Sequence, residues 1–336
     1  MKNNHRYTVP MVETFGLLEE RLLEANLNID STSLKEALDN IDGNVITIGC
    51  GGSLVIANYL SKALWEKGIF NVCKNARDIM YSNHKDTDSL FALSYSGRTH
   101  GIRMAFDEFI GNKYLITCNP NIKNLNNTNI ISLGYENMDK EKSFISLSST
   151  LIPVGEILKH HENISKEEYS KRIIKYLKEA QDWVEKLNFQ DYFSCGSSEV
   201  FEIMTGYDTE VASIFLESTL TEAGLGNAII HDKYNYCHGR STINYQDSKN
   251  HSLIYLINQK TEIDELLLEV LETKYFPIII IDVSNSKTSF LERQYELLIK
   301  SIFFSKKLAT WKKMDLSQVE YDYELVKKLY SYKGEM

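Results

Sequence analysis

Two short segments of the sequence concentrate hydroxyl side chains and glycines at the ends of apolar runs. Residues 49–53 read GCGGS and follow VITI at 45–48, and residues 94–99 read SYSGRT and follow LFAL at 90–93. Each segment leads into a stretch of helical spacing. The first turn of a helix presents unpaired N–H groups and a partial positive charge, which favour an anion. The pattern therefore predicts a phosphate site.

We expect both segments to contribute to that site. The hydroxyl donors are Ser53, Ser94, Ser96 and Thr99, and the glycines that let the backbone approach the anion are Gly51, Gly52 and Gly97. Either segment alone is also typical of a turn that leads into a capped helix. Neither has the spacing of a dinucleotide fingerprint or the Gly-Lys-Ser/Thr of a nucleotide P-loop. Their order, one strand apart, favours a shared phosphate site.

A second group of residues could move protons. The stretch 208–223 has apolar residues at helical spacing, and Glu222 lies on the same stripe as several of them and Ser218. Partial desolvation there would raise the pKa of the carboxyl group and suit proton transfer. An exposed glutamate at a helix end is the competing interpretation. His231 and His238 follow, and either imidazole could act as an acid, although a single histidine is more often structural.

These residues need an alternation of strands and helices to position them. Strand, loop and helix follow one another around both segments, and further strands are expected at 114–117 and 130–133. This order predicts a parallel sheet covered by helices on both faces, an α/β three-layer sandwich of the flavodoxin-like type. The loops at the carboxyl ends of such strands converge. Ser53 should therefore lie beside residues 94–99.

The order of strands and loops repeats in the second half of the chain. Residues 191–198 match 47–53 in type, 253–256 stand for 90–93, and 278–281 stand for 114–117. This indicates a duplicated α/β unit. The second copy has INQK at 257–260 instead of a hydroxyl loop, so one phosphate site is expected. Helices are expected at 12–25, 30–38, 54–67, 101–108, 165–187, 290–307 and 323–332, with 165–187 as an exposed connection.

The bulk composition narrows the choice of partners. The 336 residues carry a formal net charge of −9, which argues against nucleic acid as the main partner. No apolar run is long enough to span a membrane and no signal-like segment opens the chain, so we expect a cytoplasmic protein without a membrane partner. The five cysteines, at 50, 73, 118, 195 and 237, form no CxxC pair. Reduced, mostly buried thiols are expected rather than disulfides or a metal site.

The two motifs resemble those of the sugar isomerase (SIS) family. Residues 49–53 are similar to its glycine–serine opening, and residues 94–99 fit its Ser-x-Ser-Gly-x-Thr signature, in which matching hydroxyls hold a sugar phosphate. The resemblance implies two tandem SIS domains, each with a parallel five-stranded sheet, as in the isomerase part of glucosamine-6-phosphate synthase and in the fructosamine deglycases. The implied division is 1–42 for N-terminal helices, 43–164 for the first SIS domain, 165–190 for a connecting helix, 191–310 for the second SIS domain and 311–336 for a helical tail.

The same resemblance assigns roles to residues of the second half. The interval from Glu222 to His238-Gly239 is similar to that between the family's helix glutamate and its His-Gly-Pro motif, although Arg240 replaces the proline. The isomerase relatives have a second, proton-shuttling glutamate seven residues after the first, where this chain has Ile229, with His231 and Asp232 nearby. His231 or His238 would open the sugar ring, a role that a histidine of the dimer partner usually fills.

The resemblance suggests further substrate contacts. Residues 142–144, with Lys142 and Ser143, stand where relatives have a Ser-Thr-Lys-x-Phe-type segment. Tyr95 and Arg240 are other candidate contacts, and Lys312 and Lys313 are stand-ins for the catalytic lysine of the synthase.

Three functions fit these patterns. The first is a phosphosugar isomerase, deaminase or deglycase that moves a proton between C1 and C2 of a ketose or amino-sugar 6-phosphate, without a metal or organic cofactor. The second is a non-catalytic sugar-phosphate sensor or regulator, which the missing second glutamate favours. The third, a protein that binds a nucleotide sugar or another anion, fits the loops but not the duplication. Sites shared between subunits in the family imply a homodimer or homotetramer.

Overall fold

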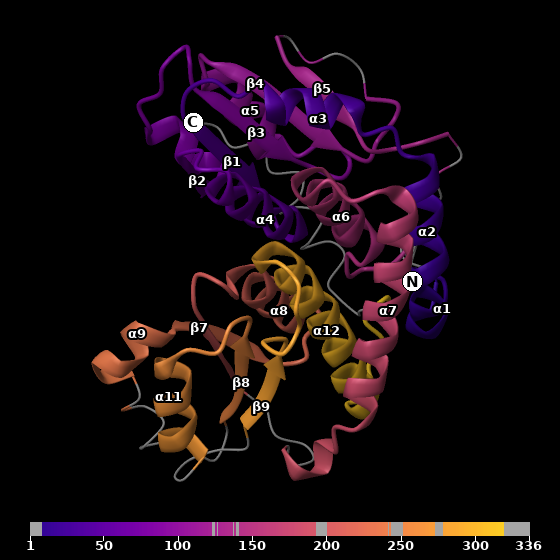
Figure 1. Ribbon diagram of the computed structural model, residues 1–336, viewed down its shortest axis with the longest axis vertical. Helices are drawn as coiled ribbons and strands as arrows, with labels where there is room; N and C mark the ends of the chain where they lie inside the picture. The colour runs from indigo at the N-terminus through magenta and orange to yellow at the C-terminus, as the bar shows by residue number, and fades with distance from the viewer. Residues whose placement is uncertain are drawn as a thin grey trace, which may run out of the picture.

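Two parallel β-sheets lie at opposite ends of the molecule, with helices between them (Figure 1). The computed structural model describes residues 9–122, 125, 127–136, 138, 141–192, 200–240, 242, 251–272 and 278–318. The first sheet has the order β2-β1-β3-β4-β5 and the second, within those residues, β7-β6-β8-β9. Every pair of neighbouring strands is parallel. The predicted α/β class is confirmed, and the second sheet has four described strands where five were expected.

The strands of the first sheet are β1 Val45–Gly49, β2 Asn71–Asn75, β3 Ser89–Leu93, β4 Asn112–Thr117 and β5 Asn129–Ser132; those of the second are β6 Val200–Thr205, β7 Asn227–Asp232, β8 His251–Ile257 and β9 Ile278–Asp282. The main helices are α1 Met11–Gly16, α2 Leu18–Asn28, α3 Thr32–Asp39, α4 Gly52–Glu66, α5 His100–Glu108, α6 Ser148–Glu162, α7 Lys166–Glu185, α8 Glu210–Glu222, α9 Lys233–Asn235, α11 Glu262–Glu272 and α12 Phe290–Trp311. Short helical turns span η1 Ala76–Tyr81, η2 Phe189–Asp191 and η3 Tyr236–Arg240.

One apolar core joins the two sheets. It contains side chains from the inner faces of both, such as Phe91 and Ile203, together with those of the intervening helices. Helix α4 of the first half packs against α6 and α8, and α12 packs against α7 and α8. An ion pair of 2.6 Å between Lys62 Nζ of α4 and Glu210 Oε2 of α8 lies in the same contact. The packing of α4 on α8 is what brings residues of the two halves together.

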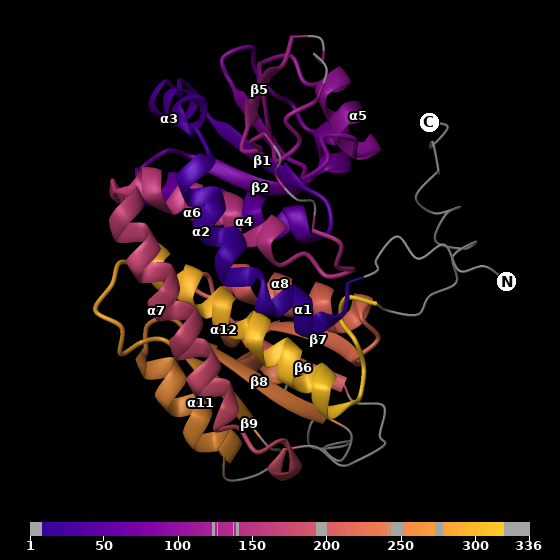
Figure 2. The same cartoon turned by 90° about the vertical axis from the view of Figure 1, so that its right-hand side faces the viewer.

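Helix α7 is not the exposed connection that its charges suggested. Figure 2 shows it running alongside α12. One face of it is buried, with Tyr169, Ile173, Tyr176 and Val184 among the buried residues. The apolar residues repeat at helical spacing among many lysines and glutamates, so overall charge obscured an amphipathic helix.

The first strand of the second sheet begins later than its predicted position. The stretch matched to the first glycine turn, 191–198, lies mostly outside the described residues, as do Cys195 and the helix expected at 323–332. Strand β6 begins at Val200 and carries a buried glutamate, Glu202, which interrupts the apolar run that would have signalled a strand. Among the described residues, no helix is both long and apolar enough to cross a membrane.

Candidate functional site

The hydroxyl loop between β3 and α5 is held by hydrogen bonds within itself. The Oγ of Ser94 lies 2.9 Å from Oγ1 of Thr99, and the N–H of Gly97 donates to Ser94 Oγ at 3.1 Å. The N–H of Arg98 donates to Ser96 Oγ at 3.2 Å. Ser94 is buried, whereas Ser96 and Arg98 are exposed. The loop therefore has a fixed shape and presents its outer hydroxyl to solvent.

Gly97 cannot be replaced without disturbing this shape. Its φ of +65° lies in the left-handed region, and a Cβ there would come within 2.0 Å of Cδ1 of Ile122. The end of β4 supports the loop from the side: Oγ1 of Thr117 donates to the carbonyl of Tyr95 at 3.0 Å, and the amide of Asn119 donates to the carbonyl of Ser96 at 3.0 Å. The backbone role of Gly97 was predicted from the sequence, whereas the supporting contacts of Thr117 and Asn119 were not.

Tyr95 turns away from a role at the site surface. Its ring packs against the main core. Burial raises the pKa of its hydroxyl to about 12, with a smaller contribution from nearby Cys118. A phenol in this setting stays protonated and supports the loop from beneath.

The glycine turn after β1 lies beside the hydroxyl loop. Strands β1 and β3 pair in parallel, with Ile48 opposite Ala92, so their following loops leave the same edge of the sheet. The Sγ of Cys50 lies 3.9 Å from the position that a Cβ would take at Gly101, in the first turn of α5. Gly51, at φ +56°, caps the start of α4, and Ser53 follows half-buried in its first turn.

Glu222 reaches this glycine turn from the second half of the chain. It is the last residue of α8, and its Oε1 lies 4.0 Å from the Cβ position of Gly51. Ser218 Oγ donates to that same oxygen at 2.8 Å. Although part of Glu222 is exposed, burial of its carboxyl group raises the pKa; the Ser218 hydrogen bond opposes this rise and the neighbouring charge of Glu217 adds to it. Burial and the charge of Glu217 thus make this carboxyl group a better proton acceptor than an isolated glutamate.

A small cavity of about 20 Å³ separates Glu222 from the start of α4. Ser146 and Thr150, at the start of α6, line it together with Gly52 and Ser218. A Cβ at Gly52 would lie 3.5 Å from Ser146 Oγ and 3.8 Å from Thr150 Oγ1. These two hydroxyl residues were missed from the sequence, where the only signal was the serine-rich run that precedes α6.

The segment of Lys142 and Ser143 is placed differently from its prediction. Ser143 is buried, and its Oγ donates to Ser317 Oγ at 3.1 Å, so it faces the C-terminal segment. Lys142 is exposed. Three residues further on, Ser146 is the member of this stretch that lies against the glycine turn. Glu141 fixes the stretch by accepting N–H bonds from residues 147, 148 and 149 at the start of α6.

His231 does not line the cavity of Glu222. It lies on β7, in register with Met204, on the sheet face opposite the one that packs on α8. Its Nε2 is 3.5 Å from Glu202 Oε2, and its ring meets Tyr236 edge-on at 5.5 Å. Burial lowers its pKa, although the charge of Glu202 opposes that shift. His231 is thus buried beside Glu202 and away from the cavity, and neither ring nitrogen has a hydrogen-bond partner among the described residues.

The other residues of this part of the chain also lie apart from the cavity. His238 and Arg240 are exposed on the turn after α9, where Gly239 has a φ of +98°. Ile229 is 44% exposed on the edge strand β7, and Asp232 caps α9 by accepting the N–H of Asn235 at 2.9 Å. Lys312 lies over the ring of Phe201, and Lys313 is exposed. None of these residues lines the cavity.

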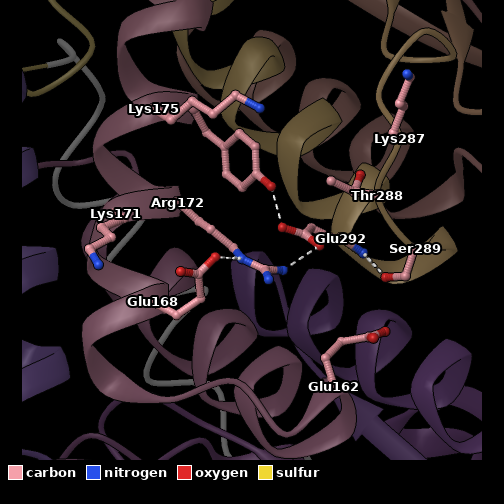
Figure 3. A pocket seen from close by; sticks show the side chains of 10 residues that line it. Glu162, Glu168, Lys171, Arg172, Lys175, Lys287, Thr288, Ser289 and Glu292 are labelled. Carbon is pink, nitrogen blue, oxygen red and sulfur yellow. Dashed lines mark hydrogen bonds and ion pairs between the residues drawn. The ribbon is translucent and has the colours of Figure 1, made fainter.

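A second hollow of about 500 Å³ lies between α7 and the start of α12 (Figure 3). Its central charges are already paired. Arg172 bonds Glu168 at 2.8 Å and Glu292 at 2.7 Å, and the Tyr176 hydroxyl donates to Glu292. These bonds tie α7 to α12, and we assign the hollow a structural role. Elsewhere in the described parts of the chain, no group of three or more His, Cys, Asp or Glu side chains is arranged to hold a metal ion.

Comparison with known proteins supports the fold. No family model matches the chain, and no curated protein matches it in sequence. Among solved structures, tagatose-6-phosphate ketose/aldose isomerase from Escherichia coli has a TM-score of 0.70 at 14% identity, over 95% of this chain and 98% of that chain. Glucosamine-6-phosphate deaminase from Thermotoga maritima has a TM-score of 0.69 at 14% identity, over 93% of this chain and 97% of that chain.

A third similar structure is the C-terminal domain of glucosamine-fructose-6-phosphate aminotransferase from Francisella tularensis, with a TM-score of 0.65 at 15% identity, over 95% of this chain and 99% of that chain. At such identities the likeness establishes the fold. The chain has the α/β fold of these three solved structures.

Proposed function

We propose that this protein is a phosphosugar isomerase, deaminase or deglycase that acts on a ketose or amino-sugar 6-phosphate. The observation that carries the proposal is the approach of the Glu222 carboxylate to Gly51, beside a hydroxyl loop at the start of a helix. An anion-binding loop and a base with a raised pKa are the two parts that this chemistry needs. The names of the similar structures, a tagatose-6-phosphate isomerase and a glucosamine-6-phosphate deaminase, agree with this substrate class.

We assign each group of residues a role in this reaction. The hydroxyls of Ser53, Ser94, Ser96 and Thr99, with amides near Gly97, bind the phosphate end of the substrate. Glu222 takes a proton from the carbon next to the carbonyl, the C–H electrons form a C=C bond, and the C=O π electrons move to the oxygen, which takes up a proton from water to give an enediol or enediolamine. The same carboxyl group then returns its proton to the former carbonyl carbon, while the hydroxyl or amino group of the other carbon loses a proton to water and becomes C=O or C=N. In the deaminase or deglycase reaction, water hydrolyses the C=N bond and the amine leaves. We assign contacts with the sugar chain to Ser146 and Thr150, which line the small cavity beside Glu222.

The proposal also includes how the two halves of the chain, and two copies of it, form the site. We assign 43–164 and 191–310 to two tandem SIS domains that share one site. His238 is exposed and is available to a neighbouring copy, so we assign it the ring-opening role across a homodimer. His231 is too enclosed for that role.

Proton exchange tests the proposal directly. The purified protein is incubated in D₂O with fructose 6-phosphate or, separately, glucosamine 6-phosphate, and loss of the C1 or C2 proton signal is followed by NMR. We expect exchange, and we expect Glu222→Gln to slow it by about 10²- to 10⁴-fold. Glu262→Gln, an exposed glutamate of α11, is the matched control and should exchange normally. Equal rates in the two variants would contradict the role of Glu222.

One observation favours a second candidate, a sugar-phosphate sensor. Ile229 stands where the resemblance predicts a second glutamate, and it is exposed on an edge strand. A sensor would bind the same sugar phosphates, as measured by calorimetry, without any proton exchange in D₂O. Binding together with exchange would exclude it.

A further inference from the structure

The carboxyl group of Glu222 lies at the end of α8, beside the glycine turn after β1. Its two oxygens have different environments. Oε1 accepts a hydrogen bond of 2.8 Å from Ser218, one turn earlier on α8, and is also the oxygen that faces Gly51. Within the described part of the chain, no protein group donates a hydrogen bond to Oε2. Oε1 is thus fixed by a hydrogen bond from the protein, and Oε2 has none from the described residues.

We propose that Ser218 is a positioning residue for Glu222, which fixes Oε1 toward the glycine turn and leaves Oε2 as the oxygen that exchanges a proton with the substrate. This inference rests on the proposed function. A free carboxyl group rotates about its terminal torsion, whose preference is broad. A hydroxyl that donates to one oxygen removes that freedom, and holding a reacting group in its productive geometry accelerates reactions.

The surroundings of Ser218 support a role beyond helix packing. It lines the cavity between α8 and α4 with Gly52, Ser146 and Thr150, so its hydroxyl lies at the site and not on a free helix surface. Two opposing effects meet at the carboxyl group: burial and the charge of Glu217 favour its protonated form, and the Ser218 hydrogen bond favours the ionised form. The Ser218 hydrogen bond therefore opposes the rise in the pKa of Glu222 that burial and the charge of Glu217 cause.

Three variants of the full-length chain test the proposal. Ser218→Ala removes the hydroxyl, Ser218→Thr retains one at the same position, and Thr221→Ala removes an exposed hydroxyl from the same helix as a matched control. Two measurements are made on each. The first is the ¹³C NMR titration of the Glu222 carboxyl carbon, assigned with Glu222→Gln. The second is the pH profile of kcat/KM with fructose 6-phosphate or glucosamine 6-phosphate.

We expect Ser218→Ala to raise the titration midpoint of Glu222 and to shift the acidic limb of the profile toward higher pH, with kcat/KM about tenfold lower at the acidic end. Ser218→Thr should restore both, and Thr221→Ala should match the unmodified protein. An unchanged midpoint in Ser218→Ala would overturn the proposal.

The two measurements separate this proposal from the proposed function. The NMR titration needs no turnover, so a shifted midpoint supports the role of Ser218 in holding the carboxylate even if neither sugar phosphate reacts. Conversely, turnover that Glu222→Gln abolishes and Ser218→Ala leaves unaltered at every pH would support the proposed function and contradict the positioning role.

Discussion

The carboxyl ends of the two sheets are built on the same strand order but are filled differently. At the end of β3, hydroxyls bond one another and an amide, and residues 94–99 contain no carboxylate. At the end of β8, the N–H and hydroxyl of Thr261 donate to Oδ2 of Asp264, at 2.8 and 2.6 Å. At the end of β8, the anion bound by these donors is therefore a side chain of the protein, the carboxylate of Asp264.

The rest of the Asp264 environment completes this internal site. Lys233 Nζ lies 2.6 Å from Oδ1, and the Tyr255 hydroxyl donates to Oδ1 at 3.0 Å. Burial opposes ionisation of Asp264, but the bonds from Lys233 and Thr261 outweigh it and hold the pKa of the carboxyl group below its ordinary value. Residues 94–99 (the open end) therefore contain no anion of the protein itself, whereas the end of β8 (the closed end) is occupied by the Asp264 carboxylate.

The largest predicted effect is the loss of stability when the Asp264 carboxylate is removed from the end of β8. Asp264→Ala leaves the Lys233 ammonium buried without its partner, and we expect it to lower the free energy of unfolding by about 3–5 kcal/mol. Urea unfolding measures this loss, with the exposed Glu262→Ala on the same helix turn as a control. Sugar-phosphate affinity of the folded fraction should not change; a parallel loss of affinity would mean that both ends take part in binding.

Gly97→Ala should distort the loop of residues 94–99. A Cβ there meets both a left-handed backbone and the side chain of Ile122, so we expect affinity for fructose 6-phosphate to fall about 30-fold or more. Gly68→Ala is the matched control, because Gly68 has a φ of +74° and open space around it. It should lose about 1 kcal/mol of stability and no affinity. Equal affinities in calorimetry would remove residues 94–99 from the phosphate site.

A pair of threonine substitutions sharpens the comparison further. Thr209 is buried, and its hydrogen bonds are like those of residues 94–99. Its Oγ1 lies 2.9 Å from Thr205 Oγ1 and accepts the N–H of Gly206 at 2.9 Å. We expect Thr99→Val to weaken sugar-phosphate binding about tenfold, because a hydrogen bond to a charged ligand is lost. Thr209→Val should instead cost about 1 kcal/mol of stability with binding unchanged. Calorimetry measures the sugar-phosphate affinity of both variants, and urea unfolding measures their stability.

The smallest effect concerns His231. Its pKa is lowered in the folded protein, mainly by burial, so the unfolded chain binds a proton first as the pH falls. Stability should therefore be highest above the ordinary histidine pKa and decline below it. His231→Gln should flatten this decline between pH 7.5 and 5.5 in urea unfolding and leave proton exchange of fructose 6-phosphate nearly unchanged. A large loss of exchange would restore His231 as a catalytic candidate.

The sequence predicted the strand, loop and helix around residues 94–99 correctly because the signals for them are local. Residues 94–99 combine a strand end, a glycine and hydroxyls within a few positions, and the structure places them at a helix start. The approach of Glu222 to Gly51 depends instead on how α4 packs against α8, and no local pattern reports that contact. Ser146 was missed for the same reason. His231 looked reactive from its spacing, but its burial beside Glu202 is set by neighbouring strands.

The packing of α4 on α8 also has an electrostatic consequence. The start of α4 lies beside the end of α8, and the Lys62–Glu210 pair joins the later part of α4 to the start of α8, so the two helices run in opposite directions. Their macrodipoles therefore place a partial positive charge on the side of Gly51 and a partial negative charge on the side of Glu222. The first favours an anion beside Gly51. The second makes the carboxylate a better proton acceptor, so the orientation of the two helices polarises the site before any ligand arrives.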